Sequence, residues 1–172
     1  MRVVIIVPTY NERENLRRLV PALQTDSERM SDDVRILVLD DGSTDGTASV
    51  AWNLATRWSN IDVVVGEKHG LGAAYVRGIA HALTELSADI VVQMDADLSH
   101  NPQDVPRLVQ ELENHDFVIG SRYVDGGSVS PAWGPWRRAV SFGGNMFARL
   151  VVGLPGIRDC TSGFRAVRAS LL

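Results

Sequence analysis

The sequence predicts an α/β fold, specifically a three-layer sandwich in which helices cover both faces of a mainly parallel β-sheet. Short aliphatic runs alternate with amphipathic stretches of helical length between residue 3 and about residue 120. The first of these runs, residues 3–7, is apolar throughout instead of alternating with polar residues, as is typical of parallel strands buried on both faces. The chain has 172 residues, so we expect one domain with a substantial core.

Five strands and four helices are expected in this region. The strands are expected at residues 3–7, 34–39, 61–65, 90–94 and 117–119. The helices are expected at residues 14–23, about 48–58, 70–83 and in the stretch after Pro102. Thr47 stands before the second helix and is expected to be its N-cap. The alternation of strands and helices predicts right-handed crossovers between parallel strands.

The pattern changes after Tyr123. Residues 124–136 are rich in Gly, Ser and Pro and are expected to form a mobile loop, and residues 137–154 show a helical pattern interrupted by glycines. The net charge is −9 over residues 1–120 and +5 over residues 121–172. This asymmetry suggests that the acidic half binds a metal ion and faces an arginine-rich half that binds phosphates. Uneven surface charge without function is the alternative.

Two aspartates, Asp95 and Asp97, directly follow the fourth expected strand. In α/β sheets, ligands gather outside the carboxyl ends of the strands, so both carboxylates should lie at that edge. Carboxylates this close repel each other, and a hard divalent cation such as Mg²⁺ or Mn²⁺ relieves the repulsion. The alternative is a turn in which one aspartate caps the next helix.

Polar groups also follow the first two expected strands. Tyr10 and Glu12 follow the first strand, and Asp40 and Asp41 follow the second. Carboxylates in such places can accept hydrogen bonds from a ribose or a base edge. For residues 40–42 a helix-capping turn is the alternative, which the presence of three acidic strand ends makes weaker.

Several other site types are excluded. Gly70-x-Gly72 follows the third strand, and Tyr75 stands where a dinucleotide fingerprint needs Gly or Ala. The chain has neither a P-loop ending in Gly-Lys-Ser/Thr nor a Gly-x-Ser-x-Gly nucleophile elbow. Its four histidines lack the spacing of zinc ligands. An aspartyl-phosphate phosphatase would carry its Asp-x-Asp after the first strand, where this chain has residues 8–10.

The sequence also suggests a reducing compartment and no membrane span. Residues 1–8 are too short an apolar run for a signal peptide. The single Cys160 excludes an intrachain disulfide. The longest apolar stretch, residues 139–157, contains Arg149 and four glycines. We therefore expect a soluble, cytoplasmic chain.

Six motifs together resemble a known family, and they occur in its order. They are Val-Pro-Thr-Tyr-Asn-Glu (7–12), Leu-Asp-Asp-Gly-Ser-Thr-Asp-Gly-Thr (39–47), Met-Asp-Ala-Asp-Leu-Ser-His (94–100), Gly-Ser-Arg-Tyr (120–123), Arg-Arg-Ala-Val-Ser (137–141) and Asp-Cys-Thr-Ser-Gly-Phe-Arg (159–165). The first three resemble the inverting glycosyltransferases of family 2, which have the GT-A fold. The last three resemble the dolichol-phosphate or polyprenol-phosphate mannose synthases within that family.

The resemblance, which covers nearly the whole chain, implies a single GT-A catalytic domain over residues 1–172. Residues 1–120 would bind the nucleotide sugar and metal, and residues 121–172 the acceptor. The implied reaction is inverting transfer of mannose from GDP-mannose to a polyprenyl (dolichyl-type) monophosphate at the cytoplasmic face of a membrane, with no nucleic-acid partner. Relatives usually continue into another strand and a basic segment, so the resemblance also implies a C-terminal truncation.

The resemblance also implies residue roles. The nucleotide sugar would be held by Pro8, Tyr10, Glu12, Asp40 and Asp41. The divalent cation (Mg²⁺ or Mn²⁺) would be held by Asp95 and Asp97, with Ser99 where the family often has a metal-contacting Gln. The acceptor phosphate would contact Arg122, Arg137 and Ser141, and Asp97 and Arg122 would be the catalytic residues.

A phosphate acceptor agrees with the residues present. A phosphate monoester with a second pKa of about 6 is largely a dianion at neutral pH and needs no general base. It needs positioning and charge balance, which arginines supply, and Arg137 and Ser141 are spaced to share one helix face. The alternatives are another donor such as UDP-glucose, a hydroxyl acceptor that would require a general base, and a non-catalytic nucleotide-binding module.

The acceptor's apolar tail suggests a role for the last expected helix. Its apolar residues are Phe142, Met146, Phe147, Leu150 and Val151, with Trp133 and Trp136 nearby as interfacial anchors. We expect them to meet the lipid tail at a membrane surface. An ordinary core helix is the alternative.

Overall fold

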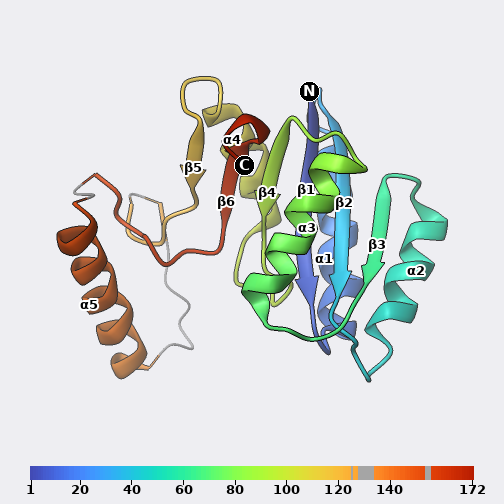
Figure 1. The fold of residues 1–172 in the computed structure, drawn as a ribbon, viewed down its shortest axis with the longest axis horizontal. Helices are drawn as coiled ribbons and strands as arrows, with labels where there is room; N and C mark the ends of the chain where they lie inside the picture. Colours follow the sequence, from blue (N-terminus) through green and yellow to red (C-terminus); the bar gives the residue numbers. More distant parts are fainter. Residues whose placement is uncertain (125, 128–133, 154–155) are drawn as a thin grey trace.

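The computed structural model describes residues 1–124, 126–127, 134–153 and 156–172. One six-stranded sheet has the order β3-β2-β1-β4-β6-β5 (Figure 1). The strands are β1 (Arg2–Thr9), β2 (Asp33–Asp40), β3 (Ile61–Val65), β4 (Ile90–Gln93), β5 (Phe117–Ile119) and β6 (Arg165–Arg168). β1 pairs in parallel with β2 and β4, and β2 pairs in parallel with β3.

Helices cover both faces of the sheet, which confirms the predicted three layers. The helices are α1 (Arg13–Ser27), α2 (Thr47–Arg57), α3 (Leu71–Thr84), α4 (Val105–Glu111) and α5 (Pro135–Val152), with short 3₁₀ turns η1 (Pro102–Asp104) and η2 (Ala169–Leu171). One face of the sheet packs against α1, α2 and α4, and the other against α3 (Figure 1). Residues 3–7 of β1 are fully buried between the layers, which explains their unbroken apolar run.

All five predicted strands are present, and the parallel arrangement of the first four is confirmed. A sixth strand, β6, was not predicted. It lies between β4 and β5 and runs antiparallel to both. Its sequence, Arg-Ala-Val-Arg, offers only Ala166 and Val167 to the core, so its apolar signal is too short to recognise. This strand brings the segment before it to the end of β4.

The predicted N-cap of α2 was wrong by one position. Gly46 is the N-cap, in a left-handed conformation with φ of 92°, and Thr47 is the first helical residue. The Thr47 hydroxyl instead donates a hydrogen bond to Asp45 Oδ1 (2.5 Å) and accepts one from the Glu12 backbone N–H (3.0 Å). Thr47 thus connects the loop after β1 to the loop after β2.

Helix α5 stands away from the sheet (Figure 1). Among the described residues, no helix combines the length and the apolarity needed to cross a membrane. Most of the predicted mobile loop, including Trp133, lies outside the described residues.

Candidate active site

The carboxyl ends of β1, β2 and β4 surround a pocket of about 320 Å³, here called the strand-end pocket. Six residues expected to form the site line it: Pro8, Tyr10, Glu12, Asp41, Asp95 and Asp97. They come from three strand ends that the parallel pairing of the sheet places side by side. The strand topology alone therefore explains why segments distant in the sequence meet here.

Asp40 and Asp41 take different roles, because successive side chains at a strand end point to opposite faces. Asp40 is completely buried and lies outside the lining of the strand-end pocket. Its carboxylate accepts hydrogen bonds from the Ser43 hydroxyl (2.5 Å) and from the Ser43 backbone N–H (2.9 Å), which fixes the turn. Asp41 lines the pocket, where the Arg77 guanidinium of α3 donates a hydrogen bond to it.

Lys68 was not among the expected residues, yet it also lines the strand-end pocket. Its Nζ atom lies 3.3 Å from the centroid of the Tyr10 ring, a close cation–π contact. Lys68 follows β3, so its position after a strand end was the available signal. Together, Lys68 and Tyr10 place a positive charge and an aromatic ring beside the acidic residues.

Asp95 is held by neighbours from two other segments. The Tyr75 hydroxyl of α3 donates a hydrogen bond to Asp95 Oδ1 (3.0 Å), and the Asp95 backbone N–H donates to His100 Nδ1 (3.1 Å). Burial raises the pKa of the Tyr75 hydroxyl, and the charge of Asp95 raises it further, so Tyr75 stays a donor. Burial lowers the pKa of the His100 imidazole, although Asp95 and Asp97 oppose this shift.

The carboxylates of Asp95 and Asp97 fit a hard divalent cation whose remaining ligands come from a bound molecule. Asp97 is exposed, and its Oδ1 accepts a hydrogen bond from the Ser99 backbone N–H (2.9 Å). Within the described parts of the chain, no three His, Cys, Asp or Glu side chains gather so that they could hold a metal ion by themselves. Mg²⁺ is commonly held by one or two carboxylates together with substrate phosphates, and Asp95 and Asp97 match that donor set.

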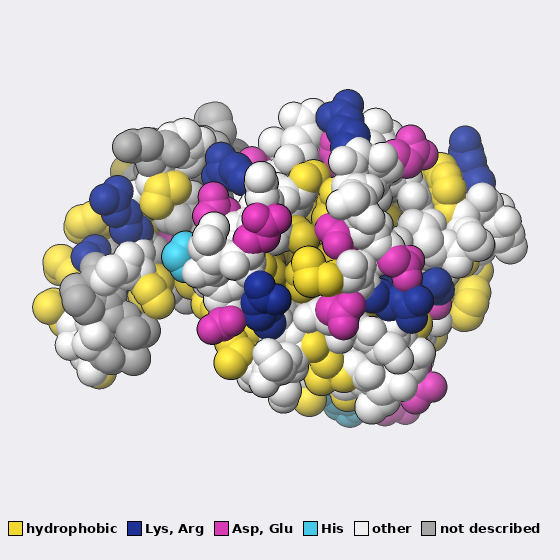
Figure 2. Space-filling model, turned by 90° about the horizontal axis from the view of Figure 1, so that it is seen from above, with side chains coloured by type: hydrophobic (Ala, Val, Ile, Leu, Met, Phe, Trp, Pro, Cys, Tyr) yellow, Lys and Arg dark blue, Asp and Glu magenta, His cyan; other side chains and the backbone are white. Residues whose placement is uncertain are grey.

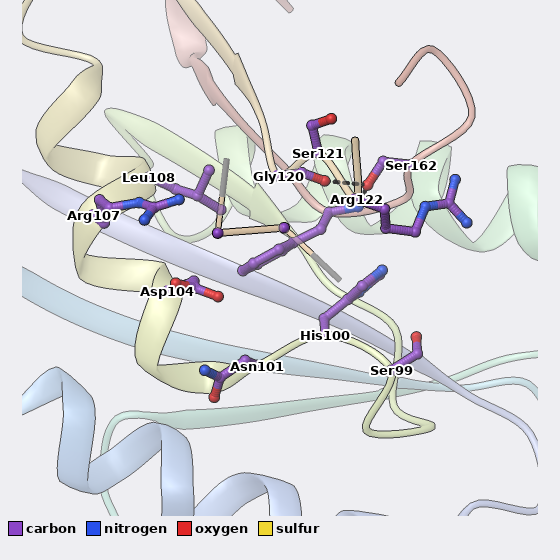
Figure 3. A pocket seen from close by; sticks show the side chains of 13 residues that line it. Ser99, His100, Asn101, Asp104, Arg107, Leu108, Gly120, Ser121, Arg122 and Ser162 are labelled. Atoms are coloured by element: carbon purple, nitrogen blue, oxygen red, sulfur yellow. Dashed lines mark hydrogen bonds between the residues drawn. The ribbon is translucent and has the colours of Figure 1, made fainter. Parts of the chain in front are cut away.

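Ser99 lies in a different pocket, here called the Arg122 pocket. Its lining includes Ser99, His100, Asp104, Arg107 and Arg122 (Figure 3). The segment of residues 95–100 therefore separates the two pockets, with Asp95 and Asp97 on one side and Ser99 and His100 on the other. The structure uses the backbone of Ser99 to fix Asp97 and places its side chain away from the strand-end pocket.

Arg122 is held by Asp159, a residue to which the sequence analysis assigned no separate role. Arg122 Nε and Nη2 donate to the two carboxylate oxygens of Asp159 (2.7 and 2.8 Å). Arg122 Nη2 also donates to Thr161 Oγ1 (2.8 Å). The hydrogen bonds to Asp159 raise the pKa of Arg122. Burial alone would raise the pKa of the Asp159 carboxyl, but the hydrogen bonds and charge of Arg122 outweigh it and hold that pKa below its usual value.

Ser141 of α5 is connected to Arg122 through the neighbouring Tyr123. The Tyr123 hydroxyl donates a hydrogen bond to Ser141 Oγ (2.8 Å). Asn145, which is buried, donates to the Ser141 carbonyl (3.0 Å) and to Thr161 Oγ1 (3.2 Å). Arg137 lies in the first turns of α5, but its side chain lies outside the described part of the structure.

A mainly parallel sheet whose carboxyl edge carries an Asp-x-Asp pair, an aromatic ring and further carboxylates has the architecture of GT-A glycosyltransferases, a class that acts on nucleotide sugars. Residues 4–172 match glycosyl transferase family 2, and the chain belongs to that family. The resemblance seen in the sequence motifs is thereby confirmed, as is the glycosyltransferase class.

Relatives of known name are similar over the whole chain. The chain is 41% identical to an undecaprenyl-phosphate mannosyltransferase of Micrococcus luteus over 173 residues, covering 100% of the chain and 68% of that protein. It is 43% identical to a polyprenol monophosphomannose synthase of Mycolicibacterium smegmatis over 175 residues, covering 99% of the chain and 63% of that protein. The chain thus spans about two thirds of the length of these relatives.

Solved structures share the fold. A glucosyl-3-phosphoglycerate synthase from Mycobacterium tuberculosis, solved with Mn²⁺, UDP and glucosyl-3-phosphoglycerate, aligns with a TM-score of 0.69 at 26% identity, covering 99% of this chain and 58% of that one. A mannosyltransferase from Pyrobaculum calidifontis, solved with GDP-mannose and Mn²⁺, aligns with a TM-score of 0.58 at 28% identity. The alignment covers 69% of this chain and 34% of that one. These neighbours confirm the GT-A fold.

Proposed function

We propose that this chain transfers mannose from GDP-mannose to a polyprenyl monophosphate, with inversion at the anomeric carbon and with a divalent cation. The observation that carries the proposal is the strand-end pocket, which combines the Asp95/Asp97 pair with Tyr10, Glu12 and Asp41. The names of the relatives support a polyprenyl phosphate acceptor and transfer of mannose. The mannosyltransferase with bound GDP-mannose supports the donor.

The nucleoside and the diphosphate of the donor each have partners in the strand-end pocket. Asp41 and Glu12 can accept hydrogen bonds from the ribose or the base, and Tyr10 offers a ring face. Asp95 and Asp97 would hold the Mg²⁺ or Mn²⁺ ion, which when bound neutralises charge on the departing diphosphate. Lys68 adds a positive charge on the same side.

The Arg122 pocket suits an acceptor that is already ionised. Asp159, the buried carboxylate beside it, is a poor proton acceptor because Arg122 holds its pKa low. A phosphate dianion requires no proton removal, only orientation and charge balance. We propose that Arg122, oriented by Asp159, and Ser141, oriented by Tyr123, contact this phosphate together with Arg137.

The exposed face of α5 supports a membrane-facing acceptor. Ser141 and Asn145 of α5 point toward the body of the protein, where they bond Tyr123 and Thr161, and Asn145 is buried. The outward side chains are apolar and at least half exposed: Trp136, Val140, Phe142, Met146, Phe147, Leu150 and Val151. Figure 2 shows hydrophobic side chains protruding at the end of the molecule that Figure 1 assigns to α5. Within the described chain α5 is therefore not a core helix, and this polarity suits a helix lying at a lipid surface.

Phe147→Glu should weaken binding to liposomes that contain a polyprenyl phosphate by about 10- to 100-fold. Burying a Phe side chain contributes about 1.5–3 kcal/mol, and each 1.4 kcal/mol changes affinity about tenfold. Flotation of liposomes over a lipid titration measures the change. Trp52→Glu is the matched control, since Trp52 is also half exposed but lies on α2. Equal flotation of both variants would show that α5 does not meet the lipid.

A second candidate is glucose transfer from UDP-glucose to a hydroxyl acceptor. It is favoured by the structural likeness to the glucosyl-3-phosphoglycerate synthase. A hydroxyl acceptor needs a general base, and Asp104 is the carboxylate in the lining of the Arg122 pocket. Asp104 would then take a catalytic role that the phosphate acceptor does not require.

One assay separates the two candidates. The whole protein is incubated with radiolabelled GDP-mannose or UDP-glucose, each with a polyprenyl phosphate or with phosphoglyceric acid, in the presence or absence of Mn²⁺. The proposal expects a lipid-soluble mannosyl product that forms only when the cation is present. A labelled product with phosphoglyceric acid alone would support the second candidate. No product in any combination would favour a non-catalytic nucleotide-binding module.

A further inference from the structure

We propose that Tyr75 and His100 are positioning residues that fix the Asp95 carboxylate in one orientation before a cation binds. This inference rests on the metal site of the proposed function. It concerns how unequally the two aspartates are held, which the sequence motif does not indicate.

Three segments converge on the Asp95 side chain. From α3, the Tyr75 hydroxyl donates to Oδ1 at 3.0 Å. From the loop after β4, His100 Nε2 lies 3.8 Å from Oδ2. From the segment before β6, Gly163 packs so closely that an added Cβ atom would lie 3.1 Å from Oδ2. The carboxylate is therefore confined on both oxygens.

One hydrogen bond and one ring stack define the orientation of His100. Its Nδ1 accepts the Asp95 backbone N–H, so in the neutral ring the proton is on Nε2, which faces the Asp95 carboxylate. The ring is also stacked on Phe164, with centroids 5.0 Å apart and planes 11° apart. Phe164 is buried against Gly120 and directly precedes β6, so the stack lies at the end of a sheet strand. His100 thus couples the backbone and the side chain of Asp95.

Asp97 is held differently. It is exposed, and the hydrogen bond to its carboxylate comes from the nearby backbone of Ser99 within the same turn. A turn of this kind can adjust more easily than the junction around Asp95. The geometry therefore indicates a fixed ligand, Asp95, and an adaptable ligand, Asp97, in one pair. Partners that orient a ligating carboxylate typically change metal affinity by about 10- to 100-fold when they are removed.

The test measures Mn²⁺ binding in the presence of GDP by electron paramagnetic resonance of the free ion, so it needs no turnover. Tyr75→Phe keeps the ring and removes the donor. His100→Phe keeps the stack on Phe164 and removes both nitrogens. Each variant should bind Mn²⁺ about 10- to 100-fold more weakly than the wild type. His100→Asn, whose side-chain oxygen can again accept the Asp95 N–H, should recover part of the loss. Tyr123→Phe, which removes a tyrosine hydroxyl that bonds Ser141, should leave Mn²⁺ affinity unchanged.

Excess Mn²⁺ separates positioning from mere support of the fold. If Tyr75 and His100 act through the cation, raising the Mn²⁺ concentration should restore the transfer rate of both variants toward that of the wild type. Unchanged Mn²⁺ affinity in Tyr75→Phe and His100→Phe, with normal binding by the wild type, would overturn this inference alone. Absence of Mn²⁺ binding by the wild type with GDP would overturn the proposed metal site, and this inference with it.

Discussion

Asp97→Asn should lower kcat/KM for glycosyl transfer by about 10²- to 10⁴-fold while leaving the folded state intact. The substitution replaces an anionic ligand by a neutral amide, so the cation is held less well. A bound cation stabilises the charge of the transition state by several kcal/mol, and each 1.36 kcal/mol is a factor of ten in rate. The fold should tolerate the change, because Asp97 is exposed and an amide oxygen can still accept the Ser99 backbone hydrogen bond (2.9 Å). Initial rates across a range of Mn²⁺ concentrations measure the effect.

Asp116→Asn is the matched control for this substitution. Asp116 is 74% exposed and pairs with Arg168, the last residue of β6, so its loss should change neither the rate nor the Mn²⁺ dependence. Equal urea midpoints for the two variants would show that they are equally folded. A rate for Asp97→Asn within threefold of the wild type would reject the cation-binding role of the Asp-x-Asp pair.

The strands of the central sheet could be predicted because a buried strand shows in the sequence as a short run of apolar residues. Residues 3–7 and 36–39 are continuous apolar runs, and the structure buries them on both faces. β6 could not be predicted in this way. Its place between β4 and β5 depends on pairing with segments about 50–75 residues earlier in the chain, and two buried residues carry too little local signal to indicate it.

The candidate site could be predicted in outline for a related reason. Parallel strands bring their carboxyl ends to one edge, so the candidate residues at the ends of strands 1, 2 and 4 were expected to meet, and the structure places six of them in one pocket. The choice between Asp40 and Asp41 could not be made, because it depends on which side chain faces the pocket. The residues that orient the site residues could not be predicted either, because they are distant in the sequence. Asp159 bonds Arg122 across 37 residues, and Tyr75 bonds Asp95 across 20.

Asp159→Asn should lower the free energy of unfolding by about 3–5 kcal/mol, the usual cost of removing one partner from a buried ion pair. The Asp159 side chain is fully buried and accepts from Arg122 Nε, Arg122 Nη2 and the Arg122 backbone N–H at 2.7, 2.8 and 3.1 Å. An amide cannot balance the guanidinium charge, and its NH₂ group would face these donors. A loss of this size is a large part of the 5–15 kcal/mol that typically stabilises a domain. Urea unfolding at neutral pH measures it.

Asp33→Asn provides a control in which the ion pair is exposed. Asp33 Oδ2 accepts a hydrogen bond from Arg2 Nε at 2.7 Å, as Asp159 does from Arg122. The side chains of Asp33 and Arg2 are, however, 54% and 41% exposed. Exposed pairs of this kind contribute about 0–1 kcal/mol, so Asp33→Asn should change stability little. Similar losses for both substitutions would show that burial of the Asp159 pair does not determine its contribution.

The pH dependence of unfolding tests the same pair by a separate route. Arg122 holds the pKa of Asp159 below its usual value, so Asp159 is more acidic in the folded chain than in the unfolded one. Its contribution is therefore complete above the unfolded pKa of about 3.9 and is lost as the pH falls through the folded value. Wild type should consequently lose stability more steeply than Asp159→Asn below about pH 4, and the difference between them should shrink. A difference that stays constant down to about pH 2 would mean that the Asp159 charge does not stabilise the fold, and that Arg122 is oriented by uncharged hydrogen bonds alone.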